Sequence, residues 1–225
     1  MEELAHRLDY RYPYEDQVKQ PQRAAPSAVG TAPEERLELV RPRFVGEEEG
    51  FTGAERGTIV HKAMMLLDLS AIATAGDLAA QLEGLVRREL LTQREAEALD
   101  PAMILGFVKS PVYARVASSP RVYRELPFNL VVPARELLME GDGEVMVQGI
   151  VDCAFVEDGR LIILDYKTDY VRPGGGILAL QERYRHQMRI YRRAMERTMG
   201  LRVGEVILFL LRTGEALTMP LEEDM

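Results

Sequence analysis

The first half of the chain places apolar residues at the spacing of α-helices. Between residues 58 and 69, apolar side chains recur three and four positions apart, and residues 77–90 repeat the pattern. Thr92 followed by Glu95 forms a capping box, which is typical of a helix N-terminus. The pattern continues to about residue 116, with interruptions at Pro101 and Pro111. We therefore predict a group of helices over this region.

From residue 122 onward the period changes to that of β-strands. Residues 122–132 are rich in β-forming side chains, and residues 144–156 alternate between apolar and polar. In residues 160–168, Arg160 is followed directly by four consecutive apolar residues. The sequence Glu157-Asp158-Gly159-Arg160 lies between the last two segments. It predicts a tight β-hairpin.

A long helix and a buried strand complete the pattern, over about residues 178–199 and 206–211, with Gly200 as the helix cap. This order of elements is typical of an α/β domain with a mixed central sheet flanked by helices. Residues 1–53 lack such a pattern and include a stretch rich in Pro, Ala and Gly. We therefore predict an irregular N-terminal arm over residues 1–53 and one domain over residues 54–225.

The predicted turn at Asp158 and Gly159 sets the register of the hairpin. Glu157 then faces Arg160, and counting back along both strands brings Asp152 opposite Asp165. Two carboxylates in such a pair repel each other and destabilise the sheet. A divalent cation between them would reverse the sign of that interaction, and oxygen ligands favour Mg²⁺ or Mn²⁺. We therefore predict a metal site at Asp152 and Asp165.

Lys167 belongs to the same predicted site, because side chains two apart on a strand share a face. Its ammonium group would contact a phosphate oxygen or an attacking water. The simpler interpretation is a solvated strand end, since an Asp-Tyr-Lys tripeptide alone carries little information. Asp165, however, follows four consecutive apolar residues, and a carboxylate in such a strand needs a partner.

Composition and charge narrow the function classes. The 225 residues are 47% apolar and 28% charged, as in ordinary globular proteins. No G-x-x-x-x-G-K-[ST] phosphate loop occurs, so the chain is not itself a P-loop motor. The net charge of −8 argues against a surface coated in basic charge, although a local basic patch stays open.

Location follows from what the sequence lacks. Its apolar runs are far shorter than the roughly 20 residues of a membrane span, and its first residues do not form a secretion signal. A single cysteine, Cys153, excludes disulfides and cysteine-based metal clusters within the chain. We expect a cytoplasmic protein.

Most of the basic residues are arginines: the chain has 24 Arg and only 4 Lys. Arg185, Arg189 and Arg192 flank the apolar stripe of the predicted helix 178–199. These three arginines form a local basic patch that would contact the phosphates of a nucleic acid, which the net charge of −8 would otherwise repel. The alternative is an ordinary solvated helix face.

The motifs together resemble a known family. Gly149-Ile-Val-Asp152 and Asp165-Tyr-Lys167-Thr-Asp169 are similar to the core of the PD-(D/E)xK nucleases. Gln187-x-x-x-Tyr191, His61 and Arg124-Glu125 resemble further motifs of the RecB-type branch of that family. Arg7–Tyr14, Arg41–Phe44 and Gln148–Asp152 are similar to the C-terminal nuclease domains of AddA-type helicase-nuclease subunits.

The resemblance implies a restriction-endonuclease-like fold and a role for each matching residue. His61, Asp152, Asp165 and the Tyr166 carbonyl would be ligands of Mg²⁺, for which Mn²⁺ would substitute. Lys167 would orient or activate the water, and Glu125 would assist near the metal. Gln187 and Tyr191 would steady the site or the DNA backbone.

Without the motifs, several of these residues have ordinary structural explanations. His61 is then a surface or capping residue, and Glu125 pairs with Arg121 or Arg124. Tyr191 belongs to the core of the helix, and Gln187 needs only a hydrogen-bond partner.

The resemblance also implies a function and partners. The expected activity is metal-dependent hydrolysis of DNA by an exonuclease that processes double-strand-break ends for recombinational repair. A helicase portion missing from this chain and an AddB-like subunit would be its partners. Two alternatives stay open: a catalytically silent scaffold that binds DNA or a partner subunit, and a stand-alone RecB-type exonuclease.

Overall fold

A computed structural model describes residues 23–26, 50–137, 143–169 and 176–221. The chain divides into two compact units, and strands β2 and β3 contribute residues to both. The larger unit contains the described residues of 50–128 and 150–221, and the smaller contains those of 1–37 and 129–149. Most of the predicted arm, residues 1–53, lies outside the described residues.

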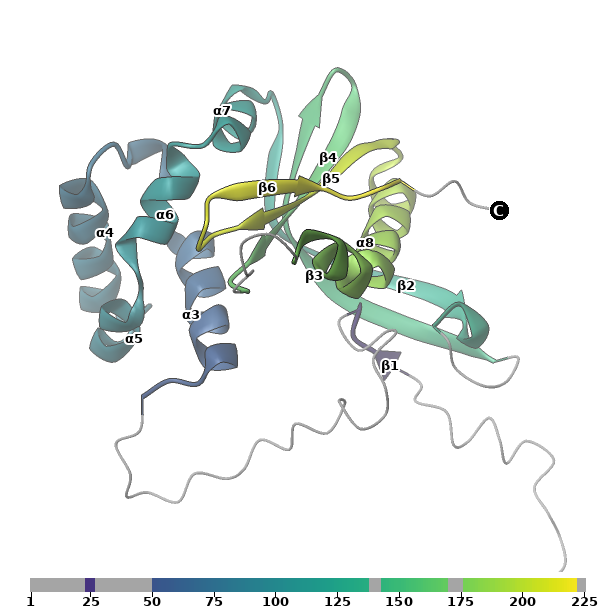
Figure 1. Cartoon of the computed structure of the whole chain (residues 1–225), viewed down its shortest axis with the longest axis horizontal. Coiled ribbons are helices and arrows are strands. Elements are labelled where there is room, and N and C mark those ends of the chain that lie inside the picture. The colour runs from purple at the N-terminus through teal and green to yellow at the C-terminus, as the bar shows by residue number, and fades with distance from the viewer. Residues whose placement is uncertain (1–22, 27–49, 138–142, 170–175, 222–225) are drawn as a thin grey trace, which may run out of the picture. The chain divides into compact units, whose positions relative to one another are not determined.

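Five α-helices open the larger unit, where the sequence pattern predicts them (Figure 1). Three begin with a capping box, and one of these is the predicted pair Thr92 and Glu95. Pro101 and Pro111 are the first residues of two further helices, so they start helices and do not interrupt one. The helices are α3 (Gly53–Leu66), α4 (Ala75–Arg87), α5 (Gln93–Ala98), α6 (Pro101–Val108) and α7 (Pro111–Ser118), with a short 3₁₀ turn at Leu69–Ala71.

The sheet of the larger unit is mixed. Strand β3 pairs antiparallel with β4, β4 pairs parallel with β5, and β5 pairs antiparallel with β6, while β2 pairs with β3. Helix α8 (Ile177–Met199) forms the crossover between the parallel strands, and Gly200 ends it with φ 68° as predicted. The strands are β2 (Val122–Pro133), β3 (Glu144–Glu157), β4 (Arg160–Lys167), β5 (Val203–Leu210) and β6 (Glu215–Thr218). Strand β6 has no counterpart among the predicted elements.

The two faces of this sheet carry different helices. Cys153, Phe155, Leu164 and Phe209 point to one face and form a single apolar core with helices α3 to α7. Helix α8 lies against the opposite face (Figure 1), where its buried residues include Met188. The fold is therefore the predicted α/β arrangement of a mixed sheet flanked by helices.

The hairpin turn confirms the predicted register over most of its length. Asp158 and Gly159 have φ values of 49° and 74°, as a type I′ turn requires. Glu157 pairs with Arg160, and the ladder continues to the pair of Cys153 with Leu164. The next pair along would join Asp152 to Asp165, and the ladder ends just before it.

The smaller unit is built around the first part of β3. A two-residue strand, β1 (Arg23–Ala24), pairs in parallel with Met146 and Val147. A 3₁₀ turn (Ala134–Leu137) follows β2, and the Ala134 N–H donates to the Gly143 carbonyl. Throughout the described part of the chain, no helix combines the length and the apolar character that crossing a bilayer demands.

Candidate metal centre

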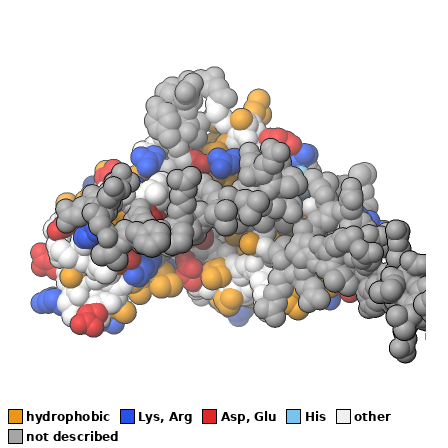
Figure 2. Space-filling model, turned by 90° about the horizontal axis from the view of Figure 1, so that it is seen from below, with side chains coloured by type: hydrophobic (Ala, Val, Ile, Leu, Met, Phe, Trp, Pro, Cys, Tyr) orange, Lys and Arg blue, Asp and Glu red, His pale blue; other side chains and the backbone are white. Residues whose placement is uncertain are grey.

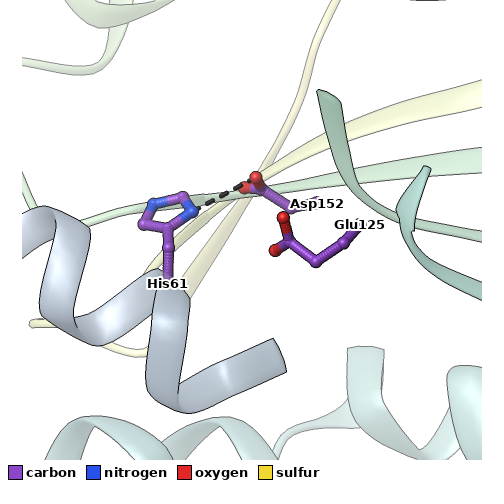
Figure 3. Close-up of side chains that lie close together, drawn as sticks. All are labelled: His61, Glu125 and Asp152. Atoms are coloured by element: carbon purple, nitrogen blue, oxygen red, sulfur yellow. Dashed lines mark hydrogen bonds and ion pairs between the residues drawn. The ribbon is translucent and has the colours of Figure 1, made fainter. Parts of the chain in front are cut away.

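His61 and Asp152 meet at the centre of the candidate site. His61 lies on α3, Asp152 lies on β3, and His61 Nδ1 is 3.1 Å from Asp152 Oδ1 (Figure 3). The Asp152 side chain is 10% exposed and that of His61 is 32% exposed. A buried carboxylate therefore has an imidazole partner, while the ring stays partly accessible to solvent.

Glu125 of β2 completes this group. His61, Glu125 and Asp152 each offer a ligand atom, and all three atoms lie within 4.8 Å of one another. Figure 3 shows the Glu125 carboxylate lying beside that of Asp152. Glu125 has a φ of 51°, which is rare for a residue with a side chain and costs roughly 1–3 kcal/mol. The strand thus bends out of regular geometry at the residue that supplies the third ligand atom.

The electrostatics of this group suit a cation. Burial raises the pKa of Glu125, and the charge of Asp152 raises it further. Burial by itself would lower the pKa of His61, but the hydrogen bond and charge of Asp152, aided by Asp165, raise it overall. The carboxylates of Asp152 and Asp165 thus outweigh the effect of burial on His61, and the charge of Asp152 also acts on Glu125. A divalent cation would offset these negative charges, and one imidazole with two carboxylates is a suitable donor set for it.

The second Asp152 oxygen explains why the hairpin ladder stops. Asp152 Oδ2 accepts a hydrogen bond from the Tyr166 backbone N–H at 2.8 Å. The side chain of Asp152 thus satisfies a backbone donor on the facing strand. Tyr166 itself points its ring into the core against Phe107, so only its backbone lies toward Asp152. The role of the Tyr166 carbonyl as a metal ligand stays a prediction.

Asp165 is the most deeply buried acid of the site, with 1% exposure. Its Oδ2 lies 2.7 Å from Lys167 Nζ, and the two side chains form an ion pair. Burial raises the pKa of Asp165 to about 6; Lys167 opposes that shift and Asp152 adds to it. Within the described residues, Asp165 is not part of the compact group of His61, Glu125 and Asp152. Asp152 and Asp165 therefore have different polar partners, and a metal site shared between them stays a prediction.

Lys167 connects the sheet to helix α8. Its Nζ lies 3.4 Å from Gln187 Oε1, and Gln187 Nε2 donates to the Tyr191 hydroxyl at 2.9 Å. The Tyr191 ring packs edge to face on Phe128, with centroids 5.6 Å apart. Gln187 thus has the hydrogen-bond partners that a buried amide needs, and one of them is the proposed catalytic lysine.

Tyr184 and Asp169 also belong to this region, although sequence reasoning did not select them for the site. Lys167 Nζ lies 4.1 Å from the centroid of the Tyr184 ring, and the Tyr184 hydroxyl donates to Asp169 at 2.9 Å. The available signal for Tyr184 was its spacing of three residues from Gln187, which places both on one side of a helix.

The three predicted DNA-contacting arginines gather at a hollow of the larger unit. Arg185, Arg189 and Arg192 line it together with apolar residues of α8, β5 and the segment after β6: Met188, Val206, Met219, Pro220 and Leu221. An α-helix turns by about 100° per residue, so these arginines lie on one side of the buried stripe and Gln187 lies on the other. The helix therefore presents its lysine-contacting residues and its arginines at different edges.

Surface charge on the described residues is mixed. Arg185 pairs with Glu182 at 2.6 Å, and Arg192 lies 3.7 Å from Glu196. In Figure 2, the described basic and acidic side chains of the visible face are interspersed. A partner with negative charge would therefore compete with acidic neighbours for these arginines.

Comparison with known proteins places the chain in a family. Residues 7–223 match the PD-(D/E)XK nuclease superfamily. The chain is 36% identical over 235 aligned residues to the A subunit of the ATP-dependent helicase/nuclease of Acetivibrio thermocellus. It is 34% identical to the protein of that name from Alkaliphilus oremlandii and 33% identical to the one from Desulforamulus reducens. These matches cover 93–96% of the chain and 18% of each relative. The chain thus spans about a fifth of the length of the curated relatives that it matches.

Proposed function

The chain belongs to the PD-(D/E)XK nuclease superfamily, and on that premise we propose that it hydrolyses DNA phosphodiester bonds with the help of Mg²⁺, which Mn²⁺ can replace. The relatives are helicase/nuclease subunits by name. We extend the proposal to a nuclease domain that works beside a helicase portion and an AddB-like subunit. In that setting it would degrade DNA from its ends, in the cytoplasm, during repair of double-strand breaks.

The compact group of His61, Glu125 and Asp152 carries this proposal. These residues come from three elements that are distant in sequence, and their ligand atoms lie within 4.8 Å of one another. Carboxylate oxygens are the ligands that Mg²⁺ and Mn²⁺ prefer, and Mn²⁺ also accepts imidazole. We also assign Asp165, on the neighbouring strand β4, to the metal site. Its charge interacts with both Asp152 and His61.

Bound there, a divalent cation would polarise the scissile phosphate and lower the pKa of a water molecule. The protein's own residues supply the other contributions to catalysis. Lys167 presents a cation toward the site, where it would oppose the negative charge that grows on the phosphate in the transition state. Its ion pair with Asp165, at 2.7 Å, keeps the ammonium beside the acids.

Gln187 and Tyr191 support the lysine from helix α8. The chain of contacts from Lys167 through the Gln187 amide to the Tyr191 hydroxyl fixes the orientation of the amide, because each of its two ends has a partner. A fixed amide oxygen gives the flexible lysine side chain a preferred position. We therefore assign Gln187 and Tyr191 to positioning.

A digestion assay tests this proposal. Linear duplex DNA, single-stranded DNA and a closed circle are incubated with the protein in EDTA, Mg²⁺ or Mn²⁺. We expect metal-dependent loss of both linear substrates and survival of the circle, which distinguishes cleavage from ends from internal cleavage. Asp152→Asn should abolish digestion. Asp158→Asn is the matched control, because it removes one acid from the same hairpin at a turn position that Asn also favours. Binding of DNA without any digestion would instead support a silent scaffold.

A further inference from the structure

The ammonium group of Lys167 has three neighbours of different chemistry. Asp165 provides a carboxylate at 2.7 Å, Gln187 provides an amide oxygen at 3.4 Å, and Tyr184 provides the face of its ring at 4.1 Å from the centroid. The lysine side chain is only 13% exposed. An ammonium over an aromatic face is attracted by the electron density of the ring, and the attraction grows as water is excluded.

Tyr184 is itself held in place from the other side. Its hydroxyl donates to Asp169 Oδ2 at 2.9 Å, and Arg183 reaches the other oxygen of that carboxylate at 3.1 Å. The Arg183 guanidinium also lies 5.5 Å from the ring centroid. Asp169 follows Lys167 by two residues, so the loop that leaves β4 anchors the ring that covers the lysine.

From this arrangement we propose that Tyr184 is a positioning residue for Lys167, and that the face of its ring holds the ammonium group in its catalytic location. The inference rests on the proposed function, since it assigns Lys167 to catalysis. A lysine side chain has four rotatable bonds, and its carboxylate partner Asp165 is also assigned to the metal site. The ring is a contact that does not depend on the charge of Asp165.

Two substitutions separate the ring from the hydroxyl. Tyr184→Phe keeps the aromatic face and loses the bond to Asp169, whereas Tyr184→Leu loses both. With linear duplex DNA and saturating Mg²⁺, we expect Tyr184→Leu to lower kcat roughly tenfold with little change in KM. Tyr184→Phe should keep most of the wild-type kcat. Equal losses in the two variants, or a loss confined to KM, would overturn the inference.

A spectroscopic measurement reports on the contact without any catalysis. The chain has only four lysines, Lys19, Lys62, Lys109 and Lys167. Protein labelled with ¹³C-lysine therefore gives four ε-methylene signals, and the loss of one in Lys167→Arg identifies that of Lys167. Because this methylene is bonded to an ammonium nitrogen 4.1 Å from the centroid of the Tyr184 ring, its proton signal should be shifted upfield of the other three. Tyr184→Leu should abolish the shift and Tyr184→Phe should preserve it.

The kinetic and the spectroscopic measurements can each contradict the inference independently of the other. An unshifted Lys167 signal in the wild type, or a shift that persists in Tyr184→Leu, refutes the contact whatever the enzyme does. If the signal behaves as expected but Lys167→Ala retains full activity, the contact stands and the catalytic assignment of Lys167 in the proposed function is wrong. Thermal melts of both Tyr184 variants show whether a loss of kcat follows from unfolding. A Tyr184→Leu variant that is folded and has the wild-type kcat also overturns the inference.

Discussion

His61 and Asp152, which are 91 residues apart in the chain, share a hydrogen bond of 3.1 Å that joins helix α3 to strand β3. The other Asp152 oxygen accepts from the Tyr166 backbone N–H. Asp152 is therefore satisfied on both sides before any metal binds. The two acids are therefore not an uncompensated pair, because Asp152 has His61 and the Tyr166 N–H as partners and Asp165 has Lys167.

Asp152→Asn should destabilise the metal-free protein modestly. An uncompensated pair of acids would gain stability from the substitution. In the structure, however, Asn loses a charge-assisted bond to His61, and it can accept at only one of the two positions because an NH2 donor replaces the other oxygen. We expect a loss of about 1–3 kcal/mol in the free energy of unfolding, measured in EDTA. An increase in stability would restore the simpler interpretation of repelling carboxylates.

Metal binding should stabilise the wild type and not the variant. The group of His61, Glu125 and Asp152 is assembled only in the folded chain. A ligand that binds only the folded state raises the free energy of unfolding by RT ln(1 + [M]/Kd). Thermal melts during a titration with Mg²⁺ or Mn²⁺ should therefore show a rising Tm for wild type and a much smaller rise for Asp152→Asn. No shift at millimolar metal would argue against a metal site.

Lys167→Ala should keep metal binding and lose catalysis. The substitution removes a cation near the scissile phosphate but no proposed ligand, so the metal-dependent rise in Tm should persist. The expected loss in kcat is roughly 100-fold or more. Lys167→Arg should restore little activity, because a broad planar guanidinium replaces a compact ammonium in a space shared with Asp165, Gln187 and Tyr184. Near-normal turnover in Lys167→Ala would contradict the assignment.

The stability of the metal-free protein should depend on the protonation of Asp165. Burial raises its pKa to about 6 from an ordinary value of 3.8, so the folded state binds this proton more tightly than the unfolded state does. The stabilising contribution is complete below about pH 4 and is lost as the pH rises through about 6. Asp165→Asn removes it. In EDTA, the stability of wild type relative to Asp165→Asn should therefore fall between pH 4 and 6, by up to about 1.4 kcal/mol per pH unit.

His61 and Glu125 contribute to the wild-type profile with the same sign, because the pKa of each is raised. Comparison of the two proteins at each pH removes most of their contribution and isolates Asp165. Parallel stability curves for wild type and Asp165→Asn would show that the Asp165 carboxyl titrates at the same pH in the folded and unfolded chains.

Arg185, Arg189 and Arg192 should determine part of the salt dependence of DNA binding. For each phosphate interaction that substitution by Ala removes, the slope of log K against log salt should fall by roughly 0.7 to 0.9. The weakening should not depend on DNA sequence. A matched control is Arg87→Ala on α4, which removes one exposed arginine from a helix of the α3–α7 group. An unchanged slope in the triple variant would assign the hollow at α8 to another role.

Local sequence determined most of the secondary structure. The capping box at Thr92, the turn at Asp158 and Gly159 and the cap at Gly200 are short-range features, because each depends on the conformations of a few adjacent residues. The hairpin register follows from the turn alone. Pro101 and Pro111 show the limit of this reasoning, since a proline breaks the pattern equally whether it ends one helix or begins the next.

The sequence motifs selected most residues of the candidate site, but they did not select Tyr184 or Asp169 and did not give the arrangement of the site. The motifs selected His61, Asp152, Asp165 and Lys167, since a motif is a property of the sequence. Only the tertiary structure decided that Asp152 bonds to His61 while Asp165 pairs with Lys167, and that Tyr184 covers the lysine. These contacts join a helix, the sheet and a second helix across long stretches of chain. Packing of the two helical layers on opposite faces of the sheet sets the distances between them, and no local pattern encodes those distances.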